Sequence, residues 1–179
     1  MSGIDTCRIR AMEFGDLTTV LAWRNHPNVR RHMLTQHEIT PEEHERWFVR
    51  TSCDRLKKLM IVEEGRRAFG FVQFSGVDAG GIADWGFYIE PGAARGSGRK
   101  LGTMALGFAF RDLELHKVCG QALGVNDASI RFHRSHGFQQ EGVLRDQRRV
   151  DGAYHDLICF GLLRHEWVAG PSGRTEVPT

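Results

Sequence analysis

The most informative stretch of this sequence is Ile89-Glu-Pro-Gly-Ala-Ala-Arg-Gly-Ser-Gly-Arg-Lys-Leu-Gly102. It follows a strand-like run, residues 82–89, and leads directly into a helix with an apolar stripe. The first turn of a helix leaves backbone N–H groups free, and glycines let an anion approach them closely. With Arg95, Arg99 and Lys100 beside it, this loop predicts a site for a phosphate or pyrophosphate group.

Two well-known phosphate-binding loops do not fit this stretch. A Walker A loop needs Gly-Lys-Ser/Thr, whereas Gly98 is followed by Arg-Lys-Leu-Gly-Thr. A Rossmann fingerprint needs a third glycine where Leu101 stands, and an early βαβ unit around it. A glycine-rich loop can also be only a tight turn, so the order of the neighbouring elements has to decide.

Size and composition indicate one soluble domain. The chain has 179 residues, of which 41% are hydrophobic and 26% charged. A net charge of +2 is too small to argue for nucleic acid binding. The four cysteines show no CxxC spacing and the nine histidines form no ligand pair, which predicts free thiols, no metal site and a cytoplasmic location. The start lacks the character of a signal peptide and no apolar run has membrane length, so no membrane association is expected.

Periodicity predicts alternating strands and helices. Strands are expected over residues 7–13, 58–63, 68–74, 82–89, 117–125, 143–150 and 153–162. Helices are expected over 17–25, from a Thr40-Pro-Glu-Glu43 start to about 51, after the glycine loop, and from Asn126 to a Gly137 stop. Asp151-Gly152 predicts a hairpin turn, and residues 169–179 a disordered tail after a single domain over 1–168. The class is α/β or α+β with one central sheet.

The order of these elements resembles a known family. Arg95-Gly-Ser-Gly98 and the helix after it resemble the Gln/Arg-x-x-Gly-x-Gly/Ala motif of GCN5-related N-acetyltransferases (GNAT). The segment from Asn126 to Gly137-Phe138 resembles the family's Asn-x-x-(Ala/Ser)…Phe-Tyr-x-x-x-Gly-Phe segment, and Glu141-Gly-Val-Leu-Arg145 continues it. The resemblance covers nearly all of residues 7–167.

The resemblance implies a fold and a donor. It implies a mixed, mostly antiparallel sheet of about seven strands with about four helices, and acetyl-CoA as the donor, without a metal. The pyrophosphate is expected on the amides of residues 96–102 and the pantetheine along the edge of the strand over 85–89. The implied cofactor-binding residues are Phe87, Ile89, Arg95, Gly96, Ser97, Gly98, Arg99, Lys100, Leu101, Gly102, Asn126 and Ser129.

Three positions depart from the family pattern. Lys100 replaces the last Gly/Ala of the first motif, and His133 replaces the tyrosine that protonates the departing CoA thiolate in many members. An imidazolium can do the same work, although a histidine here can also be a packing residue. Gln121 stands where a glutamate often relays the amine proton, and an amide is not a base. The predicted catalytic positions are His133, Tyr88 and Gln121.

The N-terminal half resembles the PseH branch of the family. The resemblance rests on two segments, Trp23-Arg-Asn-His-Pro-Asn-Val-Arg-Arg-His-Met33 and Ile39-Thr-Pro-Glu-Glu-His44-Glu-Arg-Trp-Phe48. That branch acetylates the 4-amino group of a UDP-linked amino sugar, so a small, nucleotide-linked amine is the expected acceptor. The implied acceptor-binding residues are Arg24, His44, Trp47, Ser75, Trp85 and Tyr88. Packing in the core is the preferred interpretation for Trp23 and Trp47, and ligand binding for Arg24.

The expected reaction is direct transfer from acetyl-CoA, with a main-chain N–H near Phe87–Ile89 stabilising the oxyanion. Three alternatives remain open at this level. One is an acetyltransferase of protein N-termini or ribosomal proteins, and another is an acyltransferase with an aminoacyl-tRNA donor bound through Arg99, Lys100 and residues 145–149. The third is a CoA-binding regulator without catalysis. Either a monomer or a homodimer is expected.

Overall fold

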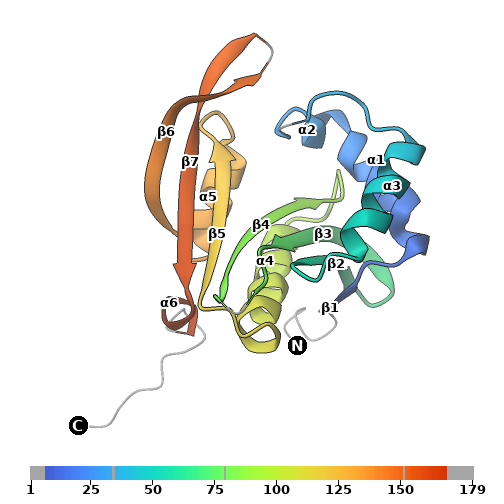
Figure 1. Ribbon diagram of the computed structural model, residues 1–179, viewed down its shortest axis with the longest axis horizontal. Coiled ribbons are helices and arrows are strands. Elements are labelled where there is room, and N and C mark those ends of the chain that lie inside the picture. The colour runs from blue at the N-terminus through green and yellow to red at the C-terminus, as the bar shows by residue number, and fades with distance from the viewer. Residues whose placement is uncertain (1–6, 34, 79, 151, 169–179) are drawn as a thin grey trace.

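The computed structural model describes residues 7–33, 35–78, 80–150 and 152–168. Its centre is a seven-stranded sheet in the order β1-β2-β3-β4-β5-β7-β6 (Figure 1). The strands are β1 (Cys7–Ala11), β2 (Lys57–Glu64), β3 (Arg67–Ser75), β4 (Ile82–Ile89), β5 (Lys117–Leu123), β6 (Gln139–Val150) and β7 (Ala153–Leu163). Neighbouring strands are antiparallel except β4 and β5, which run parallel. The expected mixed, mostly antiparallel sheet is confirmed.

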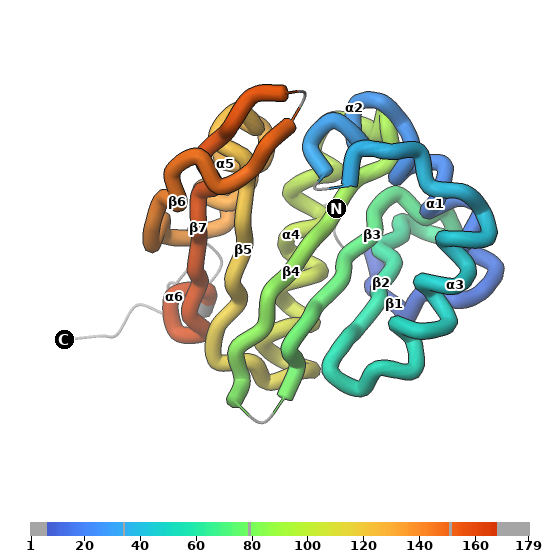
Figure 2. Tube along the Cα trace, turned by 45° about the horizontal axis from the view of Figure 1, so that its top comes forward, coloured from blue at the N-terminus to red at the C-terminus, as the bar shows by residue number. Residues whose placement is uncertain are grey.

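Four helices of nine or more residues flank the sheet. They are α1 (Leu17–Asn25), α3 (Pro41–Ser52), α4 (Ser97–Gly107) and α5 (Asp127–Ser135). Helices α4 and α5 lie on one face, and α1 and α3 cover β1 to β3 on the other (Figures 1 and 2). Shorter elements are the 3-10 turn η1 (Phe14–Asp16), α2 (Pro27–Arg30), the π-helical turn η2 (Phe108–Asp112) and α6 (Arg164–Val168). No helix among the described residues is long and apolar enough to cross a membrane.

The helix starts follow the signals in the sequence. The Thr40 hydroxyl accepts a hydrogen bond from Glu43 N at 3.2 Å, and the Glu43 carboxylate accepts one from Thr40 N at 2.8 Å, so the capping box is formed. Asn126 Oδ1 likewise accepts from Ser129 N at 3.1 Å at the start of α5. Gly137 has a φ of 89°, as expected for a residue that ends a helix in the left-handed region.

Some boundaries differ from the sequence expectation. Strand β6 begins at Gln139 rather than at residue 143, because pairing with β7 starts at Gln139↔Gly161 although the side chains there are polar and exposed. Strand β1 ends at Ala11 rather than at residue 13, and Pro27 begins a further short helix. Asp151 of the predicted turn and the predicted tail over 169–179 lie outside the described residues.

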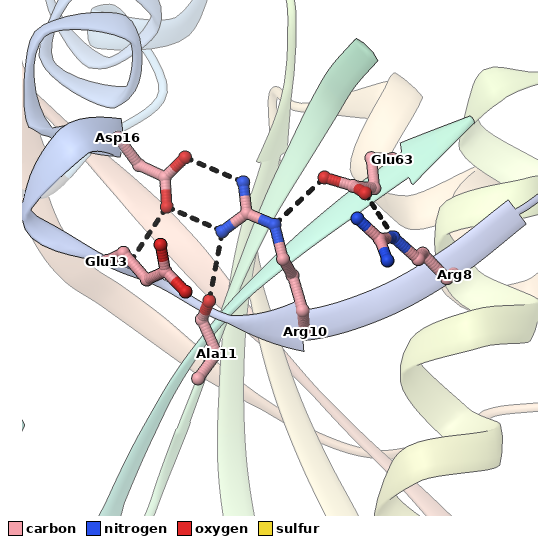
Figure 3. Close-up of polar contacts among 6 residues, drawn as sticks. All are labelled: Arg8, Arg10, Ala11, Glu13, Asp16 and Glu63. Atoms are coloured by element: carbon pink, nitrogen blue, oxygen red, sulfur yellow. Dashed lines mark hydrogen bonds and ion pairs between the residues drawn. The ribbon is translucent and has the colours of Figure 1, made fainter. Parts of the chain in front are cut away.

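A buried carboxylate joins β1 to β2 and to the start of α1. Glu63 is 3% exposed and accepts hydrogen bonds from Arg8 and from Arg10, the latter at 2.9 Å (Figure 3). Arg10 also donates hydrogen bonds from both terminal nitrogens to the Asp16 carboxylate, at 2.7 and 2.8 Å. Burial alone would raise the pKa of Glu63, but the two guanidinium groups hold that pKa below its usual value. The network holds the start of α1 against the sheet. It thereby sets the position of Arg24 near the end of α1.

Candidate functional site

Strands β4 and β5 pair over a short stretch and then separate. Their register runs from Ile82↔Lys117 to Asp84↔Cys119, and beyond it the two strands diverge (Figure 2). Main-chain groups alternate along a strand between its two neighbours. The alternation can be read directly, because Gly81 O accepts from Lys117 N on the β5 side whereas Glu90 N donates to Phe69 O on the β3 side.

This alternation shows which main-chain N–H groups of β4 have no partner on β5 after the two strands diverge. Odd-numbered residues of β4 direct their main-chain groups to the β5 side, so the N–H groups of Phe87 and Ile89 are directed into the diverging side. None of the register pairs of β4 with β5 includes them in the part of the chain that the structure describes. Two N–H groups in a row at a widening strand edge can bind an extended amide-containing chain in the manner of an added strand, or stabilise an oxyanion.

The glycine loop presents free amides at the end of the same strand. Gly96 precedes α4 with a φ of 94°, and no side chain caps this N-terminus. Lys100 N already donates to Gly96 O at 3.1 Å, and Ser97 N donates to Ala94 O at 3.1 Å. The amides that remain for an anion are therefore those of Gly96, Gly98 and Arg99, at the positive end of the helix. Residues 90–95 connect the end of β4 to Gly96.

Two of the residues expected at the cofactor belong to the packed side of α4. Leu101 is fully buried, and Gly102 is also buried, so close to His136 that a Cβ on it would lie 2.1 Å from His136 Nε2. Asn126 caps α5, because its side-chain oxygen accepts a hydrogen bond from Ser129 N. Main-chain N–H groups without a helical partner thus end before Lys100, because helical hydrogen bonding begins at Lys100 N.

Lys100 directs its charge away from the loop. Its Nζ donates to a carboxylate oxygen of Glu64 at 2.5 Å, across α4 to the end of β2. That hydrogen bond raises the pKa of Lys100, against the smaller effect of burial. The charge of Lys100 is therefore paired with a carboxylate of β2.

His133 is a buried packing residue in this structure, which corrects the expectation of an accessible proton donor. It is 1% exposed and stacks on Phe160 at 4.7 Å. The indole N–H of Trp85 can only donate, and it reaches His133 Nε2 at 3.2 Å, so the proton of the ring stands on Nδ1 and binds Ser129 O at 2.8 Å. Burial lowers the pKa of His133 to about 4, against the bond to Ser129. Both ring nitrogens are occupied and the ring is neutral at pH 7.

Trp85 also differs from its expected place. Alternation along β4 puts it on the face of α4 and α5, where it is 7% exposed and stacks on Phe138 at 5.0 Å. Trp85 and Tyr88 were both expected to bind the acceptor, but alternation along β4 puts them on opposite faces of the sheet, so they do not share one surface. Gln121 is exposed on β5 and Ser75, at the end of β3, accepts a hydrogen bond from Gln73 Nε2 at 2.9 Å.

A second polar site lies where α1 and α3 meet β4. Arg24 is 8% exposed, and its Nη2 donates to Thr35 O at 2.8 Å. His44 is 4% exposed and stacks on Trp47 at 5.0 Å. Arg24 Nη1 and His44 Nδ1 are both buried and have no hydrogen-bond partner among the described residues. Buried polar atoms are almost always satisfied in proteins, so these two atoms are able to bind a polar ligand or water.

The charges at this second site are set by burial. Burial lowers the pKa of His44, and the charge of Arg24 lowers it further, so the imidazole is neutral at pH 7. Burial raises the pKa of Tyr88, which keeps the phenol protonated although Arg24 acts in the opposite direction. Arg24 is consequently the cation of the cluster Arg24, His44 and Tyr88, which we call the arginine site. A guanidinium with a free donor fits a phosphate or carboxylate group.

Sequence reasoning missed the residues that hold this site in shape. The main-chain O of Thr35 fixes Arg24, and Asn25 exchanges hydrogen bonds with Ile39 at 2.8 and 2.9 Å, tying α1 to the start of α3. No local pattern in the sequence signals contacts between segments ten or more residues apart. In the part of the chain that the structure describes, no group of three or more His, Cys, Asp or Glu side chains could hold a metal ion.

Comparison with known proteins identifies the family of this chain. The chain matches the acetyltransferase (GNAT) domain over residues 7–139. The uncharacterised N-acetyltransferase YokL of Bacillus subtilis is 33% identical over 113 residues, which are 62% of this chain and 63% of YokL. The match therefore spans less than two thirds of that relative. Acetyltransferase PseH of Campylobacter jejuni is 24% identical over 69% of this chain and 76% of its own.

Solved structures show the same fold. A spermidine N-acetyltransferase from Vibrio cholerae, crystallised with CoA and spermine, superposes with a TM-score of 0.84 over 92% of this chain and 99% of its own, at 23% identity. At that identity the likeness concerns the fold alone. The matched domain model spans most of the chain and includes β4, the glycine loop and α5, and the chain therefore belongs to the acetyltransferase (GNAT) domain family.

Proposed function

We propose that this protein is an acyl-CoA-dependent N-acetyltransferase whose acceptor is a primary amine on a small anionic molecule, in the first place a nucleotide-linked amino sugar such as a UDP-4-amino-4,6-dideoxy sugar. Acetyl-CoA would place its pyrophosphate on the amides of Gly96, Gly98 and Arg99. Its pantetheine would add along β4, with an N–H of Phe87 or Ile89 on the thioester oxygen. Most of the acceleration would come from holding amine and thioester together.

The observation that carries the acceptor is the orphaned Nη1 of Arg24. A buried guanidinium with one terminal nitrogen left without a hydrogen bond is costly, and an anionic acceptor removes that cost when it binds. A polyamine such as the spermine bound by the structural neighbour would instead add like charge beside Arg24. The aminoacyl-tRNA alternative relied partly on Lys100, whose charge is paired with Glu64, so we do not favour it.

The test is a comparison of acceptors and of an arginine variant. Release of CoA thiol is measured with the UDP-4-amino-4,6-dideoxy sugar, with spermidine and with a free peptide N-terminus. The nucleotide sugar should give the highest kcat/KM. Arg24→Gln should raise its KM about 10- to 100-fold, because a lost charged hydrogen bond costs about 1.5–3 kcal/mol. The KM for acetyl-CoA should hardly change.

A matched control uses Arg31→Gln, a change at an exposed arginine in the same region. It should leave both KM values within about twofold, since exposed charges contribute little. Stabilisation of the Arg24→Gln protein by acetyl-CoA would show that it is folded. Faster turnover of spermidine than of the nucleotide sugar, or an unchanged acceptor KM in Arg24→Gln, would refute the proposed acceptor.

A further inference from the structure

The opening between β4 and β5 has a narrow end at the last register pair of the two strands, Asp84↔Cys119. The proposed donor enters from the glycine loop after Ile89, so its thioester end would point back along β4 toward that pair. Trp85 is the first residue of β4 beyond the pair, and Ile89 lies about 13 Å farther along the strand. The acyl group is the last part of the donor and would therefore lie nearest to the narrow end.

The two faces of the sheet differ at this narrow end. On the face that carries Tyr88 of the arginine site, the side of β4 and β5 is exposed at Ile82, Asp84, Gly86 and Gln121. We call the surface of these four residues the open face. The proposed acceptor binds on this side of the sheet. An acyl chain turned toward the open face would block the acceptor, so a productive donor has to keep its chain toward the opposite face.

Buried rings fill that opposite face directly at the narrow end. Gly120 lies on β5 one residue beyond the last pair, and a Cβ on it would lie 2.3 Å from His133 Nε2 and 2.7 Å from Trp85 Nε1. The same two nitrogens are joined by a hydrogen bond of 3.2 Å, and both rings are buried. The Trp85–His133 pair thus crosses from β4 to β5 and leaves no room beside Gly120 for even one methyl group.

The layer of rings continues along the opening. Phe87 is half-buried on the same face as Trp85, at 5.0 Å between ring centres, and lies 4.3 Å from the ring of Phe132. Phe132 reaches the glycine loop, since a Cβ at Gly98 would lie 3.7 Å from its Cδ2. A row of rings therefore runs from the narrow end of the opening to the proposed anion site. Interiors are close-packed, so an additional methylene group has to displace one of these rings.

The two rings at the narrow end are held from behind. The ring of His133 stacks on Phe160 at 4.7 Å with 6° between the planes, and its Nδ1 is bonded to Ser129 O at 2.8 Å. Trp85 stacks on Phe138 at 5.0 Å with 19° between the planes. A longer acyl chain cannot push either ring deeper without breaking these contacts, so the space for the chain is fixed.

We propose that the Trp85–His133 pair, continued by Phe87, limits the length of the acyl group, so that the protein accepts acetyl-CoA and rejects propionyl-CoA and longer donors. This rests on the proposed function in placing the thioester oxygen on an N–H of Phe87 or Ile89. His133 is then a specificity-determining residue through the volume of its ring and without giving up a proton. One methylene group too many in a tight apolar pocket costs about 10- to 200-fold in discrimination.

The test measures the Kd of acetyl-CoA, propionyl-CoA and butyryl-CoA by calorimetry, without an acceptor. In the unmodified protein the Kd of propionyl-CoA should be at least tenfold above that of acetyl-CoA. His133→Ala removes the ring and should bring the two values within threefold. His133→Phe keeps a ring of similar size but no ring nitrogen, and should keep the tenfold preference. Phe87→Ala truncates a half-buried ring of the same layer, and should reduce the preference even where His133→Ala does not fold.

Phe108→Ala is the matched control, because it truncates another half-buried ring, which packs on Phe74 at 6.1 Å beyond the far end of α4. It should leave the preference within twofold of the unmodified protein. Thermal stabilisation by acetyl-CoA shows that each variant is folded.

Equal Kd values for acetyl-CoA and butyryl-CoA in the unmodified protein would overturn the proposed limit. A preference that stays tenfold in Phe87→Ala and in folded His133→Ala would overturn it as well. The acceptor does not enter these measurements. Faster turnover of spermidine than of the nucleotide sugar would therefore refute the proposed acceptor and leave the limit on the acyl group standing, whereas failure to bind any acyl-CoA would refute both.

Discussion

At the scale of single residues, burial decides what His133 can do. Its ring stands among Trp85, Phe138 and Phe160, and its two nitrogens are bound to an indole N–H and to a main-chain O. Gly120 makes this possible, because a Cβ there would lie 2.3 Å from His133 Nε2. The position that carries a tyrosine in many relatives thus serves here to build the core under β4 and β5.

The buried ring predicts a dependence of stability on pH. The pKa of His133 is about 4 in the folded protein, below the usual value of 6.5. As pH falls from about 6.5 toward 4, the unfolded chain gains a proton that the folded protein does not, so the free energy of unfolding falls by up to about 1.4 kcal/mol per pH unit. His133→Phe should remove the contribution of His133 to the pH dependence of the free energy of unfolding, measured by urea unfolding between pH 7 and 5.

Trp85→Phe is the control for this prediction, because it removes a hydrogen bond to the ring but keeps the histidine. It should lower stability and retain the slope. His133→Phe should also keep kcat within about tenfold, whereas loss of a general acid costs about 100- to 10,000-fold. A slope unchanged in His133→Phe, or a loss of activity in the latter range, would contradict the assignment of a neutral packing residue.

At the scale of elements, α5 sets the position of the first turn of α4. The ring of His136 packs against Gly102 and against Phe132, at 4.3 Å between ring centres, and its Nδ1 lies 2.9 Å from Phe132 O. Its Nε2 lies 3.5 Å from Arg99 O, at the edge of the anion site. The free amides of the loop are therefore held by contacts from a helix about thirty residues later in the sequence.

Gly102→Ala tests this contact. In an open helix interior the change would stabilise by about 0.5–1 kcal/mol, but here the added methyl group meets His136 at 2.1 Å. We expect a loss of about 1–3 kcal/mol from overpacking, and weaker binding of acetyl-CoA, by thermal unfolding with and without ligand. Adding His136→Ala should recover part of the loss, with a coupling of about 1 kcal/mol.

Gly15→Ala is the matched control, since a Cβ at Gly15 meets no heavy atom within 4 Å. It should change the free energy of unfolding by no more than about 0.5 kcal/mol. It should leave the binding of acetyl-CoA unchanged. Strictly additive effects of Gly102→Ala and His136→Ala would show that the two residues do not act through one contact.

At the scale of the whole molecule, one sheet carries the two proposed ligand surfaces on different sides of β4. The donor surface consists of the diverging strand edge and the loop before α4, and the acceptor surface consists of the arginine site and the open face. They meet along β4 beyond its last register pair with β5, Asp84↔Cys119. Figure 2 shows the two strands separating. The parallel pairing of β4 and β5 ends after three register pairs, and beyond them the strands diverge.

Amide hydrogen exchange tests this arrangement. Acetyl-CoA should slow the exchange of Phe87, Ile89, Gly98 and Arg99 at least tenfold, since their N–H groups become bonded. ADP carries a pyrophosphate without pantetheine, and it should protect Gly98 and Arg99 only. The main-chain groups of the even-numbered residues of β4 face β3 and should respond little to either ligand. Equal protection of even and odd residues, measured by NMR, would contradict the proposed donor surface.

The sequence by itself determined the elements whose signals are local. Capping residues, a positive-φ glycine and apolar periodicity need few residues to take effect, which is why α1, α3, β4 and the start of α5 were predicted within a residue or so. The loop that we propose as the anion site was also located from the sequence, since its glycines and the helix start are neighbours in the chain. The tertiary structure alone decided the surroundings of His133, Lys100 and Trp85. Burial, ion pairing and the face of a strand depend on residues far away in sequence, and those contacts set charge and access.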